Sequence, residues 1–282
     1  MLNGIKLTEI TKDYGSFKLD NVSMTLPAGY IMGMIGENGA GKTTLIKTIL
    51  GLAKYDKGSV EIFDKPFDPE DSDVKEQIGV VMDECSFPDD MTAAQLDKVM
   101  NSCYRTWDSR EFRKHLENFE LPDDRKIKKF SKGMKMKLSI AQALSHDSRL
   151  LILDEATAGL DPVVREEVLN ILQEFIQDES RSVLISSHIL SDLEKICDYI
   201  TFIHKGKVII SESKEELLEK YAVARCSNED FAAIDKSAVA AAREGMFGVE
   251  ALVLRDAVNP ALIADNASIE DIMVYLAREE KR

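Results

Sequence analysis

The sequence predicts an α/β fold built on a largely parallel sheet, and three observations lead to that prediction. An apolar strand at Ile31–Ile35 runs into the glycine-rich segment GENGAGKTT, which spans Gly36–Thr44 and opens a helix that continues to Leu50. A second strand, Arg149–Leu153, is too apolar to be half exposed, which is typical of a parallel sheet covered on both faces. Strands and helices alternate along most of the chain.

The glycine-rich segment has the composition of a cradle for a nucleoside triphosphate. Its three glycines let the backbone turn with its N–H groups inward, and Lys42 supplies a positive charge for the β- and γ-phosphates. Thr43 offers a hydroxyl to Mg²⁺, and the helix dipole that begins at Thr44 favours the same anion. The predicted nucleotide-binding residues of this segment are Gly36, Glu37, Asn38, Gly39, Ala40, Gly41, Lys42, Thr43 and Thr44.

Two strands precede the cradle and one follows its helix. Ile5–Ile10 alternates apolar and polar residues, and Phe17–Leu26 and Gly58–Phe63 have strand composition. A polar loop is expected over 64–73. Tyr14 lies on the turn between the first two strands, where its ring could stack on adenine or could cap the sheet.

A helical subdomain at about residues 88–145 is expected between two strands of the main sheet. The strand Ile78–Met82 ends at Asp83, and the pattern is helical from Met91 to Leu121, until Pro122 breaks it. Ser131 is well placed to cap a further helix that runs to Leu144. The rest of the core is expected to contain the helix Val163–Gln177, the strand Ser182–Ser187, the helix Ile189–Cys197, and a hairpin of Tyr199–Ile203 and Lys207–Ile210.

The pattern changes after Ser211. Two strand candidates, Ala222–Cys226 and Val249–Arg255, flank the alanine-rich stretch Ala238–Arg243, and a last helix is expected at Ser268–Ala277. We interpret this region as a separate βαβ-like appendage without visible chemistry. The predicted domains are residues 1–213 and 214–282.

The composition and charge of the chain argue against several classes of function. The 282 residues carry a net charge of −14, which argues against nucleic acid as a ligand because phosphate backbones require a basic face. No apolar stretch reaches the roughly 20 residues that span a bilayer, and the first residues do not resemble a signal peptide, so a cytoplasmic chain is expected. The four cysteines show no metal-ligand spacing, and reduced, structural thiols are expected.

Asp154 and Glu155 follow the buried strand directly. They lie where its carboxyl end should reach the triphosphate cradle, since ligands of open α/β sheets bind at that edge. Asp154 can share Mg²⁺ with Thr43, and Glu155 can polarise the attacking water.

These motifs, in this order over about residues 2–211, resemble the nucleotide-binding subunit of an ABC transporter. Gly36–Thr43 is similar to the Walker A loop, Leu150–Asp154 to the Walker B strand, and Glu155 to the catalytic glutamate. The resemblance implies a P-loop NTPase with a RecA-like parallel sheet core, an antiparallel β subdomain, an inserted helical subdomain and a small C-terminal α+β appendage. It assigns Tyr14 to adenine stacking, His188 to the γ-phosphate contact and Asp161 to communication between two subunits.

Two motifs depart from the family pattern. The signature, usually LSGGQ, is Phe130-Ser131-Lys132-Gly133-Met134 here, and Lys132 could either add a charge near an opposing nucleotide or point to solvent. The glutamine expected after Ile78–Met82 is replaced by Asp83, which could still accept a water of the metal shell while adding negative charge.

The family mechanism implies a sandwich of two ATPase subunits, a homodimer or a heterodimer. ATP on the P-loop of one subunit is covered by Ser131, Lys132, Gly133 and Met134 of the other, so these residues are expected to act in trans. The expected cofactors are ATP and Mg²⁺.

The expected partner is a multi-spanning membrane permease. Its contact surface is expected around the loop Asp83–Asp90. Phe87 of this loop could either contact the permease or pack onto the helices. The chain would then be peripheral on the inner face of the cell membrane and would power export of a drug, peptide or other small substrate. The alternative is an ABC ATPase of an assembly or regulatory system with no membrane partner.

Overall fold

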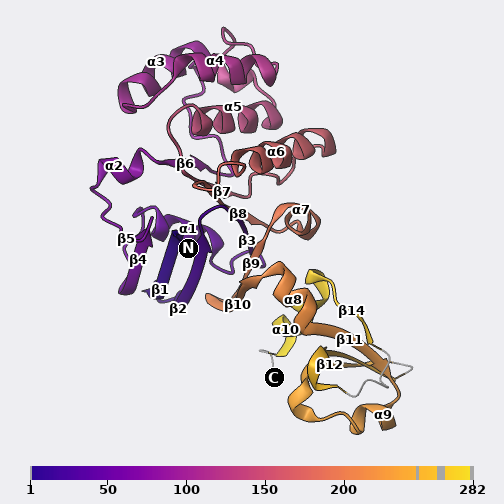
Figure 1. Cartoon of the computed structure of the whole chain (residues 1–282). Coiled ribbons are helices and arrows are strands. Elements are labelled where there is room, and N and C mark those ends of the chain that lie inside the picture. The colour runs from indigo at the N-terminus through magenta and orange to yellow at the C-terminus, as the bar shows by residue number, and fades with distance from the viewer. Residues whose placement is uncertain (1, 246–247, 259–263, 280–282) are drawn as a thin grey trace.

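The computed structural model describes residues 2–245, 248–258 and 264–279, which form three sheets and the helices around them (Figure 1). The central sheet has the strand order β10-β9-β3-β8-β7-β6. Five of its strands are parallel, and β10 pairs antiparallel with β9 at one edge. The bounds are β3 Ile31–Ile35, β6 Ile78–Val81, β7 Leu150–Asp154, β8 Ser182–Ser187, β9 Tyr199–His204 and β10 Lys207–Ser213.

Both faces of the central sheet are buried, as the apolar strands predict. Leu151 and Leu153 of β7 face a cluster with the helices α5 (Lys132–Leu144), α6 (Pro162–Phe175) and α7 (Leu190–Ile196). Leu150 and Ile152 face the opposite cluster, which contains α1 (Lys42–Ile49). Asp154, the last residue of β7, continues the series of Leu150 and Ile152 and therefore lies on the α1 side of the sheet.

The second sheet has the order β2-β1-β4-β5 and is antiparallel. Its inner face packs on α1. Its bounds are β1 Asn3–Asp13, β2 Lys18–Pro27, β4 Lys57–Ile62 and β5 Lys65–Pro66. The expected polar loop over 64–73 is therefore wrong in part, because β5 pairs with β4 there and a short helix, α2 (Ser72–Lys75), begins behind the Asp71 cap.

The helical subdomain contains α3 (Ala93–Cys103), α4 (Ser109–Asn118), the 3₁₀ turn η1 (Ile127–Lys129) and the start of α5, which lie together at one end of the molecule (Figure 1). Thr92 forms a capping box with Gln95, and Asp108 caps α4. These two caps divide the helical pattern between Met91 and Leu121 into two helices.

The C-terminal region is an antiparallel sheet of order β12-β13-β11-β14, so the βαβ interpretation is wrong. The alanine-rich stretch forms most of β12, because pairing with β13 outweighs the helix propensity of alanine. Its bounds are α8 Lys214–Lys220, β11 Tyr221–Cys226, α9 Asn228–Ala232, η2 Lys236–Ala238, β12 Val239–Gly245, β13 Gly248–Leu254, η3 Arg255–Ala257, β14 Ala264–Asn266 and α10 Ile269–Glu279.

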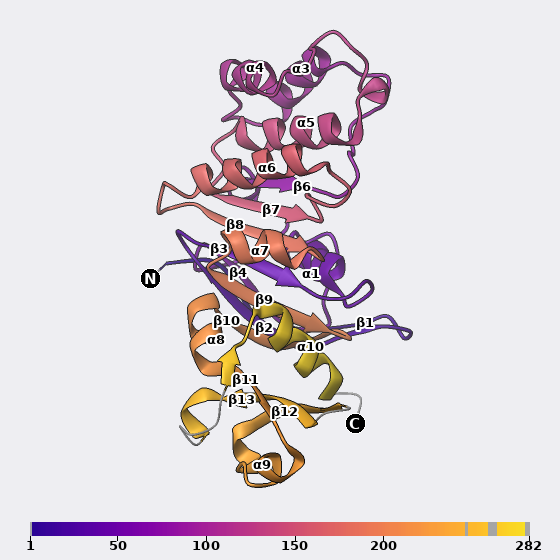
Figure 2. The ribbon, with the colours of Figure 1, turned by 90° about the vertical axis from the view of Figure 1, so that its right-hand side faces the viewer.

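The C-terminal sheet is not detached from the core. Helix α10 lies between them (Figure 2), and Ile269 and Ile272 belong to the same apolar cluster as Leu193 and Ile196 of α7. One continuous core therefore crosses from the central sheet into the C-terminal region.

All four cysteines are free thiols. Within the described ranges, no helix is long and apolar enough to cross a bilayer.

Candidate nucleotide-binding site

The glycine-rich segment lies between β3 and α1, and its shape requires glycine at two positions. Gly41 has φ 114°, and a Cβ there would lie 2.8 Å from the ring of Phe17. A Cβ on Gly36 would lie 2.4 Å from the carbonyl oxygen of Ile203. Backbone N–H groups can therefore line this turn without side chains in the way.

Lys42 is the charged centre of the segment. Its side chain is 6% exposed, and Nζ donates to the carbonyl oxygen of Gly36 at 2.8 Å. The same Nζ lies 3.2 Å from Oε1 of Glu155. The lysine is thus held at the mouth of the loop by one backbone oxygen and one carboxylate.

Glu155 is held from several sides. Its Oε2 lies 2.6 Å from Nδ1 of His188, and its backbone N–H donates to Oγ of Ser186 at 3.0 Å. Ser186 Oγ in turn donates to Oδ1 of Asp154 at 2.6 Å. Glu155 has φ 52°, a left-handed conformation that costs a non-glycine residue about 1–3 kcal/mol and that concentrates at functional sites.

These residues surround an open pocket of about 740 Å³. Tyr14 is 50% exposed at its rim, with the Lys12 ammonium 5.3 Å from the ring centroid. The lining residues are Tyr14, Ser16, Phe17, Glu37, Asn38, Gly39, Gly41, Lys42, Thr43, Thr44, Asp83, Glu155, Ala158 and His188.

The structure brings together most of the residues predicted for nucleotide contact. Gly36, Ala40 and Asp154 are buried, Asp154 to 3% exposure, and are not among the residues that line the pocket. Sequence reasoning missed Phe17, which the glycine at position 41 accommodates, and Ser186, which joins Asp154 to Glu155. Phe17 lies three residues after Tyr14, but only its packing on the loop marks it.

The signature residues lie outside this pocket. Ser131 caps α5 by accepting from the N–H of Met134 at 3.2 Å, and Asp161 caps α6 by accepting from Val163 and Val164. A Cβ on Gly133 would be 3.5 Å from Val164, an ordinary contact. Packing within this chain therefore does not require glycine at position 133.

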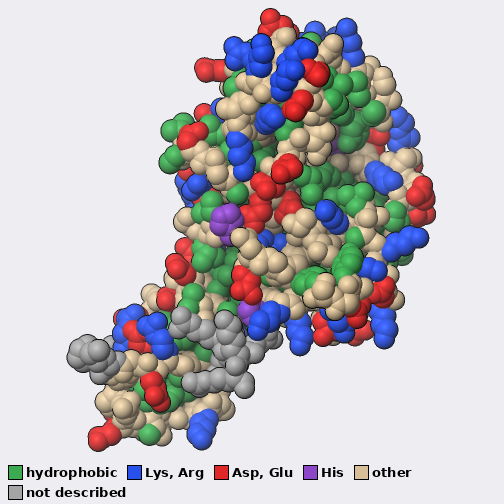
Figure 3. Space-filling view, turned by 180° about the vertical axis from the view of Figure 1, so that it is seen from behind, with side chains coloured by type: hydrophobic (Ala, Val, Ile, Leu, Met, Phe, Trp, Pro, Cys, Tyr) green, Lys and Arg blue, Asp and Glu red, His purple; other side chains and the backbone are tan. Residues whose placement is uncertain are grey.

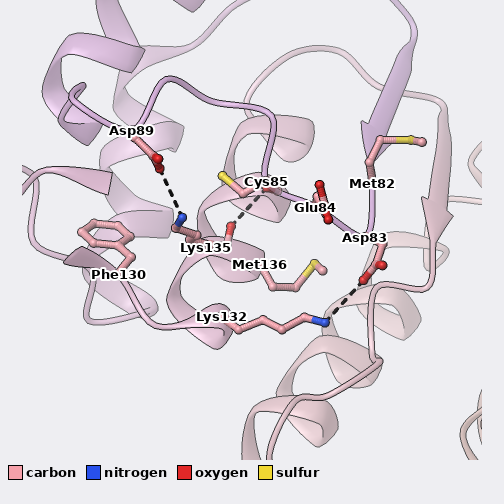
Figure 4. A pocket seen from close by; sticks show the side chains of 10 residues that line it. Met82, Asp83, Glu84, Cys85, Asp89, Phe130, Lys132, Lys135 and Met136 are labelled. Atoms are coloured by element: carbon pink, nitrogen blue, oxygen red, sulfur yellow. Dashed lines mark hydrogen bonds and ion pairs between the residues drawn. The ribbon is translucent and has the colours of Figure 1, made fainter. Parts of the chain in front are cut away.

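The two departures from the family pattern meet each other. Lys132 Nζ lies 3.4 Å from Asp83 Oδ1 in a second pocket of about 510 Å³ (Figure 4), and each side chain is about half exposed. Lys132 is thus partly exposed to solvent and partly engaged by Asp83. Its positive charge, at the start of α5, partly neutralises the negative charge of Asp83, although an exposed pair of this kind stabilises a fold by only about 0–1 kcal/mol.

The loop that follows Asp83 is less exposed than its apolar residues suggest. Cys85 and Phe87 are partly buried and pack against the cluster of the helical subdomain. Of the two interpretations of Phe87, packing onto the helices is confirmed. Pro88 and Asp89 are exposed, and Asp89 pairs with Lys135 at 3.3 Å (Figure 4).

Charge is unevenly distributed over the surface. Lys and Arg side chains are prominent over the helical end in the view from behind, whereas Asp and Glu side chains gather near the middle beside a histidine (Figure 3). Among the described residues, no group of three or more His, Cys, Asp or Glu side chains is arranged to hold a metal ion.

A parallel sheet, a glycine loop with a buried lysine, and a carboxylate at the end of the neighbouring apolar strand define a P-loop nucleoside triphosphatase. The family model described as ABC transporter matches residues 19–158. The bacitracin transport ATP-binding protein BcrA of Bacillus licheniformis is 37% identical over 208 residues, which cover 73% of this chain and 68% of that protein. The lantibiotic transport ATP-binding protein SrtF of Streptococcus pyogenes is 36% identical over 224 residues, which cover 76% and 95%.

Solved structures agree on the fold. An ATP-binding subunit of an ABC transporter is 25% identical, with a TM-score of 0.69 over 76% of this chain and 91% of that chain. A dimeric ATP-binding cassette bound to ADP and phosphate is 24% identical, with a TM-score of 0.65 over 74% and 98%. The present chain belongs to the ATP-binding proteins of ABC transporters, and its activity is ATP hydrolysis.

Proposed function

We propose that this ATPase powers a separate membrane permease that exports a peptide, a drug or another small substrate. The observation that most strongly supports an ATPase site is that Lys42, Glu155 and His188 converge on one pocket. A transport role and a peptide or drug as the substrate are supported by the names of its relatives, which are ATP-binding proteins of bacitracin and lantibiotic transport.

In this proposal the triphosphate lies on residues 36–44, with adenine on the exposed ring of Tyr14. Lys42 and His188 now contact the carboxylate of Glu155, and the γ-phosphate would compete for both. Once the γ-phosphate draws Lys42 away, the Glu155 carboxylate would be free to accept a proton from the attacking water. His188 would remain within hydrogen-bond reach of that carboxylate.

The donor set fits Mg²⁺. The Thr43 hydroxyl is exposed in the pocket, Asp154 has one oxygen engaged by Ser186, and Asp83 lines the same pocket. A hydroxyl with one or two carboxylates, rather than an all-protein cage, is the usual protein contribution to Mg²⁺ held beside phosphates. When bound, the ion neutralises charge on the β- and γ-phosphates.

The site is proposed to be completed by a second copy of the chain. Ser131, Lys132, Gly133 and Met134 open α5 outside the pocket, and the room around Gly133 is consistent with a contact beyond this chain. The N-terminal dipole of α5 would favour a γ-phosphate presented by the other subunit. Asp161, at the start of α6, would connect the two halves.

The permease is proposed to dock at the pocket in Figure 4, next to Asp89 and Lys135, which would place the chain on the inner face of the cell membrane. Nucleic acid is not an expected partner. The alternative, an assembly or regulatory ATPase without a membrane partner, is disfavoured because the relatives are transport proteins.

Recovery of the tagged chain from detergent-solubilised membranes tests the partner. We expect a multi-spanning protein to co-purify, and Asp89→Lys to reduce its recovery because the change reverses a charge at the docking pocket. Glu229→Lys, on the exposed side of α9, serves as the matched control. Recovery of the chain without any multi-spanning protein would support the alternative instead.

A further inference from the structure

His204 is a buried polar residue that the ATPase mechanism does not use. It ends β9, and its side chain is 3% exposed. Its Nδ1 lies 3.2 Å from Oε1 of Glu37, the second residue of the glycine-rich loop. Its Nε2 is buried and has no hydrogen-bond partner among the described residues.

This arrangement favours one tautomer of the ring. Nε2 has no partner in either tautomer, so the contact with Glu37 decides between them: a lone pair on Nδ1 would repel the carboxylate oxygen 3.2 Å away, whereas a proton there is attracted to it. We therefore assign the proton of the neutral ring to Nδ1, where it faces the carboxylate of Glu37.

The turn after His204 supports the loop at two more points. The Gly206 N–H donates to the carbonyl oxygen of Ala40 at 2.9 Å, and the Ile203 carbonyl fills the space beside Gly36. The turn is itself held from below, because the Asp20 N–H donates to the Gly206 carbonyl oxygen at 2.8 Å. The carboxylate of Glu37 is thus drawn toward a fixed part of the fold.

Glu37 needs such a partner because of where it lies. It lines the nucleotide pocket, its side chain is 57% exposed, and its carbonyl oxygen accepts from the Ala40 N–H at 3.0 Å within the loop. A carboxylate free to swing into this pocket would repel the phosphates of ATP.

We propose that His204 is a positioning residue for nucleotide binding, which draws the Glu37 carboxylate away from the phosphates and steadies the loop. The inference rests on the proposed seat of the triphosphate on residues 36–44. It assigns a role in the ATPase site to the end of β9, where His204 lies 167 residues after Glu37 in the sequence.

Substitutions at His204 test the inference through the dissociation constant for Mg·ATP, measured by calorimetry on the full chain. His204→Leu removes the contact with Glu37 and the unpartnered Nε2 together. We expect His204→Leu to raise the dissociation constant about 10-fold without lowering the melting temperature, because the Glu37 carboxylate would no longer be held away from the phosphates. His204→Asn, whose amide nitrogen can replace Nδ1, should bind nearly as tightly as the parent.

A double-mutant cycle separates charge positioning from simple packing. If His204 acts through Glu37, then His204→Leu should add nothing to Glu37→Ala, and the double variant should bind ATP like Glu37→Ala alone. Parent-like affinity of His204→Leu, or additive losses in the double variant, would overturn the proposal. A lower melting temperature with unchanged affinity would overturn it also, because it would show a structural role only.

Lys42→Ala distinguishes a failure of this inference from a failure of the proposed site. It should abolish measurable Mg·ATP binding if the triphosphate lies on the loop. Parent-like binding by Lys42→Ala would refute the seat itself, whereas loss in Lys42→Ala with parent-like binding in His204→Leu would refute the role of His204 alone.

Discussion

Glu155 is the residue on which turnover is expected to depend most. We expect Glu155→Gln to retain ATP binding, because the glycine-rich segment is unchanged and a neutral amide competes less with the γ-phosphate for Lys42 than the carboxylate does. Its turnover should fall by at least about 10²-fold, the low end of a general-base effect. Steady-state ATPase measurements check this, with Glu179→Gln, an exposed carboxylate elsewhere, as the control. Near-normal turnover in Glu155→Gln would assign the base to another residue.

Adding one methyl group at Gly133 tests whether this residue approaches the nucleotide of a second subunit. A Cβ fits this position within the chain, and alanine favours a helix over glycine by about 1 kcal/mol. Gly133→Ala should therefore keep or raise the melting temperature and keep ATP binding, while ATPase activity falls several-fold. Unchanged activity would mean that no phosphate approaches Gly133 closely.

At this scale the sequence identifies residues that lie close together along the chain or at strand ends. Lys42, Asp154 and Glu155 could be predicted because glycines and apolar strands mark them. The contacts of Ser186 and His204 could not be predicted, because they depend on the pairing of β7 with β8 and of β3 with β9. The contact between Lys132 and Asp83 joins residues 49 apart, and no local pattern encodes it.

Among the elements, the loop between α5 and β7 carries a buried imidazole, His146, whose titration affects stability. Burial lowers the pKa of His146 below 6.5, against opposing effects of the Glu76 carbonyl and nearby carboxylates. The unfolded chain therefore takes up the proton first as pH falls below about 6.5, and the folded state loses stability. We expect His146→Asn to lose less melting temperature than the parent between pH 7.5 and 5.5. Equal losses in the two proteins would exclude this contribution.

Element types were largely predictable in the core, where the period of apolar residues is clear. The C-terminal region was misread because β12 is rich in alanine and its strand character comes from β13. The short β5 was missed for a related reason, since a two-residue strand has no period of its own.

For the whole molecule, the shared apolar cluster predicts that the C-terminal region stabilises the core. Ile272 is 1% exposed on α10, and its truncation to Ala should cost about 2–5 kcal/mol. Val274→Ala on the same helix is the matched control, because Val274 is 40% exposed.

Deleting residues from Glu215 onward should likewise lower the melting temperature while ATP binding persists. A folded truncation that no longer binds ATP would contradict this division of roles.

The central claim is that one chain supplies the P-loop and a second copy supplies the signature. Mixing two variants tests it: Lys42→Ala, which keeps an intact signature, and Ser131→Arg, which keeps an intact P-loop. Each alone should be nearly inactive, and a 1:1 mixture should recover about a quarter of the parent ATPase activity, because half of the dimers are mixed and each mixed dimer has one complete site. A mixture as inactive as its two components would contradict the account.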